Sequence, residues 1–341
     1  MATNLAKVAA RAGVSLATAS RVLNGGARVV TASLRARVLA AAQELQYVPN
    51  AQAQALARAS NAIVGVLVHD MSDPYFSEIL RGIQRVATNA NRLVITSNSY
   101  RDPDRELEYV RLLHAHRVDA LILAGSGLDT STYSQHMAHQ IAIFCGSGGR
   151  VVLIGRHHVP GDTVLPDNWG GAHQLATYFA QLGHRRIGVI AGPALLTTTH
   201  DRLEGFRSGL EAAGIVLGDH DVVSGDFSRD SGVAATHQLL MQAPDLTAIF
   251  AHNDVMAVGA LVALRQRGIA VPQQMTVAGF DDIPLADDVT PALTTVRLPM
   301  VELGVLAMTM ALEPATEGVR SVTCATELVI RASSGTVTPH R

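Results

Sequence analysis

The chain opens with apolar side chains at helical spacing. A first short helix is predicted by apolar residues at i, i+3, i+4 and i+7, namely Leu5, Val8, Ala9 and Ala12. Thr3 or Asn4 can cap this helix, and Gly13 ends it. A second helix is predicted over residues 16–23, between the capping residue Ser15 and a pair of glycines.

A third helix is predicted from Thr31 or Ser33 to about Tyr47. Its buried stripe would consist of Leu34, Val38, Ala41, Ala42 and Leu45. Two short helices joined by a turn that contains glycine, as the first two are here, form the helix-turn-helix arrangement. We therefore expect a small helical head whose second helix can enter the major groove of DNA by its N-terminal end.

Beyond Ser60 short apolar runs alternate with amphipathic stretches. Buried strands are predicted at residues 63–68, 93–96, 120–123, 151–154, 186–190, 222–223, 248–250 and 275–280. Helices are predicted over residues 76–89 and 103–115. Repeated β-α-β units predict parallel sheets covered on both faces. The pattern restarts near residue 186, so we expect two doubly wound lobes with a ligand-binding cleft between them, facing the carboxyl ends of the strands.

Charge is divided unevenly along the chain. The 341 residues carry 27 Lys+Arg and 29 Asp+Glu, a formal net charge of −2. Residues 1–60 hold seven of the basic residues and one acidic residue, Glu44, which is +6. The remaining 281 residues hold 20 basic and 28 acidic residues, which is −8. This asymmetry favours a head that binds a polyanion, although a chance fluctuation in an arginine-rich chain would look the same.

Composition narrows the class of protein. A length of 341 residues favours two or three domains, and 48% apolar with 16% charged residues is typical of a globular protein. Two cysteines, Cys145 and Cys324, cannot build a disulfide framework. The sequence shows neither an apolar run of membrane-spanning length nor a signal-peptide core at its start, so we expect a cytoplasmic protein.

The predicted second helix has a polar side suited to DNA. Its candidate DNA-binding residues are Ala17, Arg21 and Asn24, with Thr18 and Ser20 beside them. Arg21 can donate two hydrogen bonds to guanine, whereas Ser20 and Asn24 suit phosphate. Leu16 is ambiguous, because its spacing is that of the apolar side but at the first turn it could touch a thymine methyl. The alternative for Arg21 is a solvated surface arginine.

At this point a family resemblance becomes specific. Residues 15–25 (SLATASRVLNG) resemble the recognition-helix signature of the lactose-repressor (LacI/GalR) family of bacterial transcription regulators. Residues 37–50 (RVLAAAQELQYVPN) resemble the third helix of that family and the start of its hinge.

The hinge that this resemblance implies follows Pro49. Asn50 can cap a short helix over residues 51–58, which is marginal in isolation because nucleation is costly. The resemblance implies that this segment orders on operator DNA, with Leu56 as the wedge in the minor groove. Gln54 stands where many members carry arginine. The alternative is an alanine-rich linker.

The remainder resembles the periplasmic-binding-protein-like effector domain of the same family. The matching motifs include residues 73–76 (DPYF), 167–171 (DNWGG), 183–187 (GHRRI), 202–206 (RLEGF), 225–227 (GDF), 253–254 (ND), 279–282 (GFDD) and 291–296 (PALTTV). The resemblance runs from about residue 3 to about residue 332, with residues 128–150 as a departure. The fold class is therefore α/β: an all-α helix-turn-helix head and hinge, then a two-lobed body of doubly wound parallel sheets.

The resemblance implies that each lobe of the body is built from two separate segments of the chain. A DNA-binding domain is expected at residues 1–48 and a hinge at 49–60. The N-terminal lobe is expected at residues 61–158 and 292–318, and the C-terminal lobe at residues 159–291 and 319–333.

Candidate effector-binding residues lie on loops at strand ends. Side-chain chemistry selects Arg202 as a fork for hydroxyls or a carboxylate, Asn253 and Asp281 as partners for sugar hydroxyls, and Tyr75, Phe76 and Phe227 as flat walls. Family position adds Ser126, Arg156 and Thr198. The aromatic residues could instead belong to the core, and Asp281 could be a turn or cap residue. Asp254 and Asp282 are expected to be structural, and Leu196 replaces the arginine of the purine-responsive branch.

The chain lacks the sequence motifs of common enzymes. It has no His-Glu-x-x-His, no Walker phosphate loop and no Gly-x-Ser-x-Gly, and its histidine pairs lack further ligands, so no cofactor or metal is expected. The leading hypothesis is a homodimeric repressor that binds a pseudo-palindromic double-stranded operator. A mono- or disaccharide effector would control it from the cleft. The alternatives are a sugar-binding receptor without a DNA-binding role, which the basic head argues against, and an enzyme.

Overall fold

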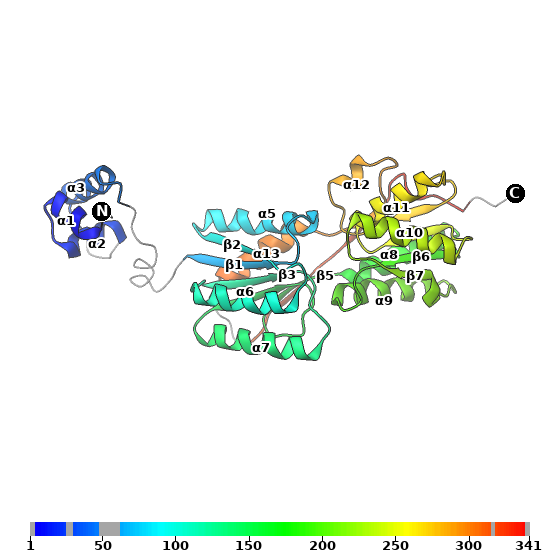
Figure 1. The fold of residues 1–341 in the computed structure, drawn as a ribbon, viewed down its shortest axis with the longest axis horizontal. Helices are drawn as coiled ribbons and strands as arrows, with labels where there is room; N and C mark the ends of the chain where they lie inside the picture. The colour runs from blue at the N-terminus through cyan, green and yellow to red at the C-terminus, as the bar shows by residue number, and fades with distance from the viewer. Residues whose placement is uncertain (1–3, 25–29, 48–61, 315–317, 338–341) are drawn as a thin grey trace. The chain divides into compact units, whose positions relative to one another are not determined.

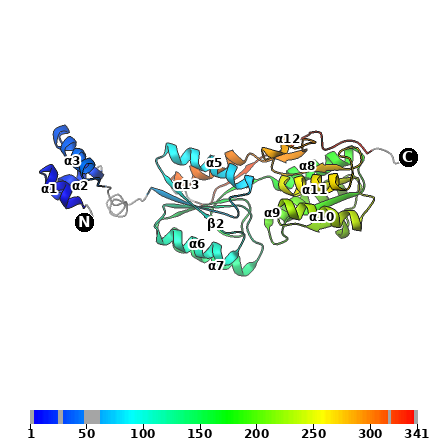
Figure 2. The same cartoon turned by 45° about the horizontal axis from the view of Figure 1, so that its top comes forward.

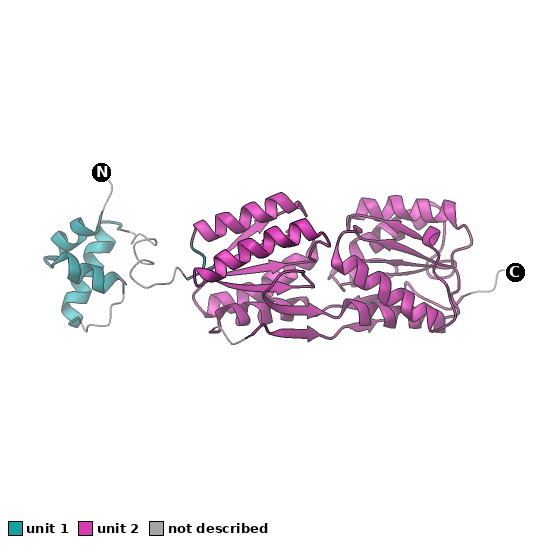
Figure 3. Cartoon of the chain, turned by 90° about the horizontal axis from the view of Figure 1, so that it is seen from below, with its two compact units in different colours: residues 1–63, 117–119 teal, residues 64–116, 120–341 magenta. Residues whose placement is uncertain are grey.

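The computed structural model describes residues 4–24, 30–47, 62–314 and 318–337, apart from the side chain of Asn24. The predicted hinge, with Asn50 and Leu56, lies outside these residues. The chain divides into two compact units, residues 1–63 with 117–119 and residues 64–116 with 120–341 (Figure 3). The head and the two-lobed body are described separately below.

The described part of the head holds three helices, as the sequence predicts. They are α1 (Leu5–Ala12), α2 (Leu16–Asn24) and α3 (Ala32–Glu44). The side chain of Asn4 accepts a hydrogen bond from the Lys7 amide, and Gly13 ends α1 in the left-handed conformation at φ 62°. Helix α3 ends at Glu44, three residues before the predicted end at Tyr47.

One small apolar core holds the head together. Its fully buried members come from all three helices and are Val8, Ala9, Ala12, Ala19, Val38, Ala41 and Ala42. Leu45 packs against this cluster, whereas Leu34 is only partly buried. A core made mostly of alanine lets the three helices approach closely. This packing holds α2 in a fixed orientation relative to α1 and α3.

The first lobe of the body is built on a six-stranded sheet in the order β11-β5-β4-β3-β1-β2. Its strands are β1 (Ile63–Val68), β2 (Leu93–Asn98), β3 (Ala120–Ala124), β4 (Arg150–Ile154), β5 (Asp162–Pro166) and β11 (Ser321–Cys324). From β1 through β3, β4 and β5 to β11 the pairing is parallel. Helices α5 (Pro74–Asn89) and α13 (Met300–Leu312) cover one face, and α6 (Pro103–Ala115) and α7 (Ser131–Gly146) cover the other (Figures 1 and 2).

The second lobe is built on a parallel sheet in the order β7-β6-β8-β9. Its strands are β6 (Ile187–Ala191), β7 (Val222–Ser224), β8 (Ala248–Ala251) and β9 (Thr276–Ala278). Helix α8 (Asn168–Gln181) packs on α9 (Thr197–Glu211), and α10 (Arg229–Gln242) packs on α11 (Asp254–Gln266). The short helices η1 (Asp219–Asp221) and α12 (Leu285–Asp288) complete this lobe.

The chain crosses between the lobes at positions that differ from the predicted ones. Strands β5 and β11 both pair within the first sheet, so the crossings lie after Pro166 and after Cys324. The predicted lobe boundaries at residues 158/159 and 318/319 therefore come too early. A third crossing precedes α13, where β10 (Thr295–Arg297) pairs antiparallel with β12 (Glu327–Val329) between the two sheets.

The length and composition of the described helices can be compared with what a membrane-spanning helix needs. None of them combines the length and the apolar composition that crossing a membrane requires.

Candidate DNA-binding face and effector cleft

Helix α2 presents one exposed face and one buried face. Ala19 is fully buried, and Val22 and Leu23 pack against the core of the head. Ala17 and Arg21 are exposed, and Leu16 is 53% exposed, which settles the ambiguity of Leu16 in favour of the outer face. Ser15 caps the helix, because its hydroxyl accepts a hydrogen bond of 3.2 Å from the Thr18 amide.

Two basic residues of the head act within the head itself. Arg11 forms an ion pair with Glu44 at 2.7 Å between α1 and α3. Arg37 donates to the carbonyl oxygens of Ala12 and Gly13, at 2.5 and 3.2 Å, and so satisfies the C-terminal end of α1. The side chain of Arg21 makes no hydrogen bond or ion pair with a described residue, so its guanidinium is available to an external acceptor.

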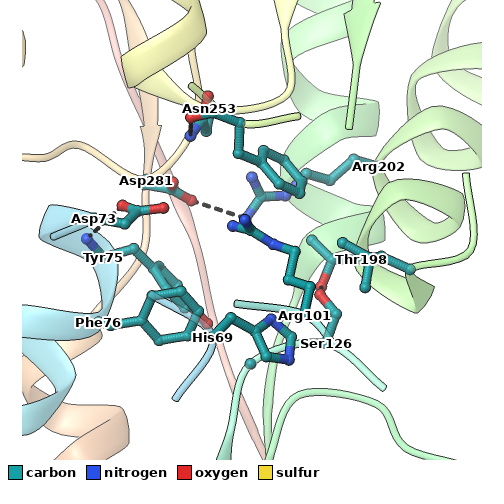
Figure 4. A pocket seen from close by; sticks show the side chains of 13 residues that line it. His69, Asp73, Tyr75, Phe76, Arg101, Ser126, Thr198, Arg202, Asn253 and Asp281 are labelled. Carbon is teal, nitrogen blue, oxygen red and sulfur yellow. Dashed lines mark hydrogen bonds and ion pairs between the residues drawn. The ribbon is translucent and has the colours of Figure 1, made fainter. Parts of the chain in front are cut away.

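The body contains a cleft between its lobes, with about 390 Å³ of space that atoms do not fill, part of which is open solvent. Its lining comes from both lobes: His69, Asp73, Tyr75, Phe76, Arg101, Gly125, Ser126, Leu196, Thr198, Arg202, Phe227, Asn253 and Asp281 (Figure 4). These residues follow the carboxyl ends of parallel strands in both sheets, where doubly wound folds bind ligands. Eight of the nine predicted effector-binding residues line this cleft.

Arg202 of α9 is the buried hub of the cleft, with 3% of its surface exposed. Its Nε donates to Asn168 at 2.9 Å, its Nη1 donates to the carbonyl oxygen of His252, and its Nη2 donates to Asp281 at 2.8 Å. The guanidinium carbon also lies 3.9 Å from the centre of the Phe280 ring. Each nitrogen of the fork therefore has a protein partner, and the side chain is held rigidly.

Asp281 presents a carboxyl group from a strained backbone position. Its φ of 111° lies in a region that residues with a Cβ rarely adopt. Burial raises the pKa of Asp281 to about 7, although the charge of Arg202 acts in the opposite direction. Such a carboxyl group can accept a hydrogen bond from a ligand hydroxyl or, when it is protonated, donate one to it.

The neighbouring carboxylates are structural, as predicted. Asp254 is fully buried, and burial raises its pKa well above the usual range. It accepts hydrogen bonds from the Thr295 hydroxyl at 2.5 Å and from the Ile283 amide at 2.8 Å. Asp282 forms ion pairs at 2.7 Å with Arg297 and with Arg331.

The predicted aromatic walls differ in how far they reach the cleft. Phe76 is only 3% exposed and belongs mostly to the core, as its alternative interpretation states. Tyr75 is half-buried and meets Phe76 edge to face, with 4.9 Å between ring centres. Phe227 lies in the loop after β7 with φ 71°, and the guanidinium of Arg101 lies 5.2 Å from its ring centre.

Asn253 and the two hydroxyl residues complete the polar lining. Asn253 caps α11 by accepting from the Met256 amide at 2.9 Å, and it donates to the carbonyl oxygen of Phe227 at 3.2 Å. Ser126 of the first lobe donates to Thr198 of the second lobe at 2.5 Å. This hydroxyl pair spans the cleft directly.

Arg156 is the predicted effector-binding residue that does not line the cleft. Its Nε and Nη2 donate to the carboxylate of Asp201 at 3.2 and 2.7 Å, and its carbonyl oxygen accepts from the Thr197 hydroxyl. The bidentate pair with α9 holds the guanidinium beside the cleft, so Arg156 is outside the lining in this structure and a contact with the effector stays a prediction.

Five residues of the lining were not among the predicted effector-binding residues: Gly125, Leu196 and the charged or ionisable residues His69, Asp73 and Arg101. The positions of the last three carry a signal that could have found them, because His69 directly follows β1, Arg101 follows β2, and Asp73 caps α5 through the Tyr75 amide. Each stands just past a strand on the ligand-binding edge of a parallel sheet.

A helix-turn-helix head on a two-lobed body with a ligand cleft defines a ligand-responsive DNA-binding regulator. Residues 4–50 match the model of bacterial regulatory proteins of the lacI family, and residues 176–334 match a periplasmic binding protein-like domain. The regulator GalS of Salmonella typhimurium is 38% identical, over 90% of this chain and 88% of its own length. The chain belongs to the lacI family, whose members regulate transcription and are not enzymes.

Solved structures of related regulators show the same fold. The Lac repressor dimer bound to operator and the anti-inducer ONPF matches with a TM-score of 0.84 and 27% identity, covering 98% of this chain and all of that one. The CelR–cellobiose complex matches with a TM-score of 0.71 and 31% identity, covering 97% of this chain and all of that one.

Proposed function

We propose that this regulator is a homodimeric repressor whose α2 helices bind the two halves of a pseudo-palindromic operator. A neutral mono- or disaccharide in the cleft would change its affinity for that operator. The lining of the cleft supports the part of this proposal that concerns the effector. Its lining holds two acidic residues, Asp73 and Asp281, and two arginines, Arg101 and Arg202, and Arg202 forms an ion pair with Asp281, so the formal charges balance. The hydroxyl, amide and aromatic side chains that remain suit a polyol ring.

The DNA half of the proposal assigns base and phosphate contacts to the exposed face of α2. Leu16, Ala17 and Arg21 are exposed there, with Thr18 and Ser20 half-buried beside them. Asn24, Asn50 and Leu56 remain proposed contacts from the sequence, because the structure does not describe their side chains. Among the relatives, the Lac repressor dimer binds operator and CelR binds cellobiose, which supports both halves by analogy.

A direct test measures binding of the full chain to its own promoter region at increasing salt, with and without sugars. We expect specific binding that weakens steeply with salt, because phosphate contacts release counterions. A melting-temperature screen of neutral sugars and sugar phosphates then identifies the effector, since a ligand of the native state raises the melting temperature. Absence of promoter binding at low salt would refute the repressor. Stabilisation by sugar phosphates alone would refute the neutral effector.

A further inference from the structure

Arg101 is an arginine of the cleft without a polar partner. It follows β2 in the first lobe, lines the cleft and is half-buried. Its Nε is buried without a hydrogen bond, and neither Nη1 nor Nη2 joins a hydrogen bond or an ion pair with a residue that the structure describes. Arg202, the other arginine of the lining, has a protein partner at each nitrogen. Arg101 therefore still has N–H groups that it can donate to a ligand.

The guanidinium of Arg101 lies over an aromatic ring of the opposite lobe. Its carbon is 5.2 Å from the centre of the Phe227 ring, within the range of a cation–π contact. Phe227 belongs to the second lobe, so this contact spans the cleft. Figure 4 shows the side chain of Arg101 extending through the middle of the lining. The ring attracts the positive charge, but it does not replace hydrogen bonds to oxygen.

The backbone on both sides of this contact is held in an unfavourable conformation. Tyr100 and Arg101 have φ of 54° and 62°, and Phe227 has φ of 71°, in the left-handed region that residues with a Cβ rarely adopt. The Tyr100 amide donates to the carbonyl oxygen of His69 at 2.7 Å, and the Arg101 amide donates to the Ser99 hydroxyl at 3.2 Å. Such strain persists only where the surrounding structure imposes it, and it is common at ligand sites. The direction of the Arg101 side chain is therefore fixed by the fold.

The charges around Arg101 favour a neutral ligand group over an anion. Burial lowers the pKa of Arg101, whereas the charges of Asp73, Asp70 and Asp226 raise it. None of these three residues forms an ion pair with Arg101, so they act on its charge from beyond ion-pair distance. An anion at the guanidinium would be repelled by the three carboxylates, and a hydroxyl group would not.

We propose that Arg101 is a specificity-determining residue of the cleft, which donates hydrogen bonds to two neighbouring hydroxyl oxygens of the effector. This inference rests on the proposed neutral sugar effector and deepens it. A planar guanidinium presents two parallel N–H groups that match a pair of adjacent oxygens, whereas the ammonium of lysine is a single point charge. The effector must then carry two adjacent hydroxyl groups on the side that faces the first lobe.

The ligand-free chain provides the first test. A cation that is largely buried without hydrogen bonds costs free energy, so an unbranched apolar side chain should replace it without loss of stability. We expect Arg101→Met to melt at the temperature of the wild type or above it. Arg111→Met, which removes an exposed arginine from α6 of the same lobe, is the control for net charge. A fall in melting temperature confined to Arg101→Met would mean that Arg101 supports the fold, and it would overturn the proposal.

Defined probes test the donor role. Melting temperatures of the full chain are measured with cellobiose, D-ribose and inorganic phosphate, and calorimetry gives the dissociation constant of each stabilising probe. Arg101→Met should bind a stabilising sugar at least about tenfold more weakly than the wild type, because two hydrogen bonds to a charged donor are lost. Arg101→Lys should not restore the affinity, since an ammonium lacks the parallel pair of donors. Arg111→Met should bind like the wild type, and cooperative melting with retained promoter binding confirms that the variants fold.

The outcomes separate this inference from the proposed function. If the wild type and Arg101→Met bind a sugar with equal affinity, or if Arg101→Lys binds it like the wild type, the neutral effector stands and the paired donor role is overturned. Stabilisation by phosphate alone refutes the neutral effector and the hydroxyl contact with it. If no probe raises the melting temperature, the tested sugars fail as effectors, and the ligand-free comparison decides whether Arg101 is held for a ligand or for the fold.

Discussion

At the scale of single residues, Arg202 shows how one buried charge organises the cleft. Its hydrogen bonds reach α8, the end of β8 and the loop after β9, so several elements of the second lobe depend on one side chain. Arg156 is a contrasting case, because its pair with Asp201 is 41% exposed on the arginine side. We therefore expect the removal of Arg202 to lower the free energy of unfolding more than the removal of Arg156 does.

Arg202→Met should lower the free energy of unfolding by about 3–5 kcal/mol, because it leaves Asn168, the carbonyl oxygen of His252 and Asp281 buried without the donor that they share. Arg156→Met, which breaks a partly exposed ion pair, should cost at most about 1 kcal/mol. Urea unfolding followed by the fluorescence of Trp169, the single tryptophan of the chain, measures both. Equal losses in the two variants would contradict the proposed hub.

Arg21 belongs to the same scale in the head. Arg21→Ala should weaken binding to the operator by about 1–3 kcal/mol, the usual cost of one bidentate base contact, and relax the preference at one base pair. The melting temperature should not change, because the guanidinium contacts no described residue. Arg265→Ala, which removes an exposed arginine from α11 of the body, is the matched control for net charge. Gel-shift titrations in which both variants bind like the wild type would refute the base contact.

His157 makes the stability of the first lobe depend on pH. Burial lowers its pKa to about 4 in the folded chain, below the 6.5 of the free side chain. Between these values the unfolded chain binds a proton that the folded chain does not, so stability is lost as the pH falls from about 6.5 towards 4.

Relative to His157→Gln, the free energy of unfolding of the wild type should therefore fall by at most about 1.4 kcal/mol for each unit by which the pH is lowered between about 6.5 and 4. Thermal unfolding at several pH values between 4 and 8 measures the difference. His139→Gln, at an exposed position of α7, is the control. A difference between wild type and His157→Gln that stays constant with pH would show that His157 is not held neutral.

At the scale of elements, the sequence was informative wherever a strand is buried on both faces. Strands β1, β3, β6 and β8 are continuous apolar runs and were predicted near their observed bounds. Strand β5 alternates buried and half-buried residues, and β11 is mostly exposed, so neither forms the apolar run that marks a buried strand. The lobe crossings were misplaced because these two weakly patterned strands define them.

The same limit applied to the cleft. Side-chain chemistry found Arg202, Asn253 and Asp281, whose loops carry recognisable polar groups. It missed His69 and Arg101, because their role depends on which strands lie side by side, and strand order is a property of the folded sheet. Family position added Arg156, whose partner Asp201 is brought to it only by the approach of the second lobe.

A glycine allows two helices of the first lobe, α5 and α13, to pack closely where they cross. Gly304 of α13 faces α5 so closely that a Cβ would lie 2.1 Å from the carbonyl oxygen of Ile79. Gly304→Ala should therefore force α5 and α13 apart and cost about 1–3 kcal/mol. Gly146→Ala, at the end of α7 with no atom within 4 Å of the added methyl, should be neutral or stabilising. Calorimetric melting compares them, and a neutral Gly304→Ala would contradict the close crossing.

At the scale of the whole molecule, the two lobes of the body are joined by more than the three crossings of the chain. Beside the cleft, Leu128 bridges to Leu196 and the Thr197 amide donates to the carbonyl oxygen of Gly127 at 3.0 Å. The Arg156–Asp201 pair lies at the same junction. These contacts stabilise the arrangement in which the cleft is enclosed, which is the arrangement that a ligand touching both lobes would select.

Breaking this junction should weaken sugar binding without touching the sugar. If Arg156 and Asp201 favour the enclosed cleft, Arg156→Ala and Asp201→Ala should each lower the apparent affinity for the sugar found in the melting screen, because fewer molecules are in the binding-competent state. The double variant should lose little more than either single variant, since one interaction accounts for both losses. Titrations followed by Trp169 fluorescence measure the cycle, which we expect to give a coupling of about 0.5–1 kcal/mol.

The pair between Arg186 and Asp245 provides the control for that cycle. It has the same two-pronged geometry, at 2.8 and 3.1 Å, but both of its residues belong to the second lobe. Asp245→Ala should therefore leave the affinity for sugar unchanged while removing an ion pair whose arginine is as exposed as Arg156. Equal effects of Asp245→Ala and Asp201→Ala would mean that the losses come from general destabilisation. A loss confined to the junction would show that closure of the lobes contributes free energy to effector binding, which is the coupling that an allosteric regulator requires.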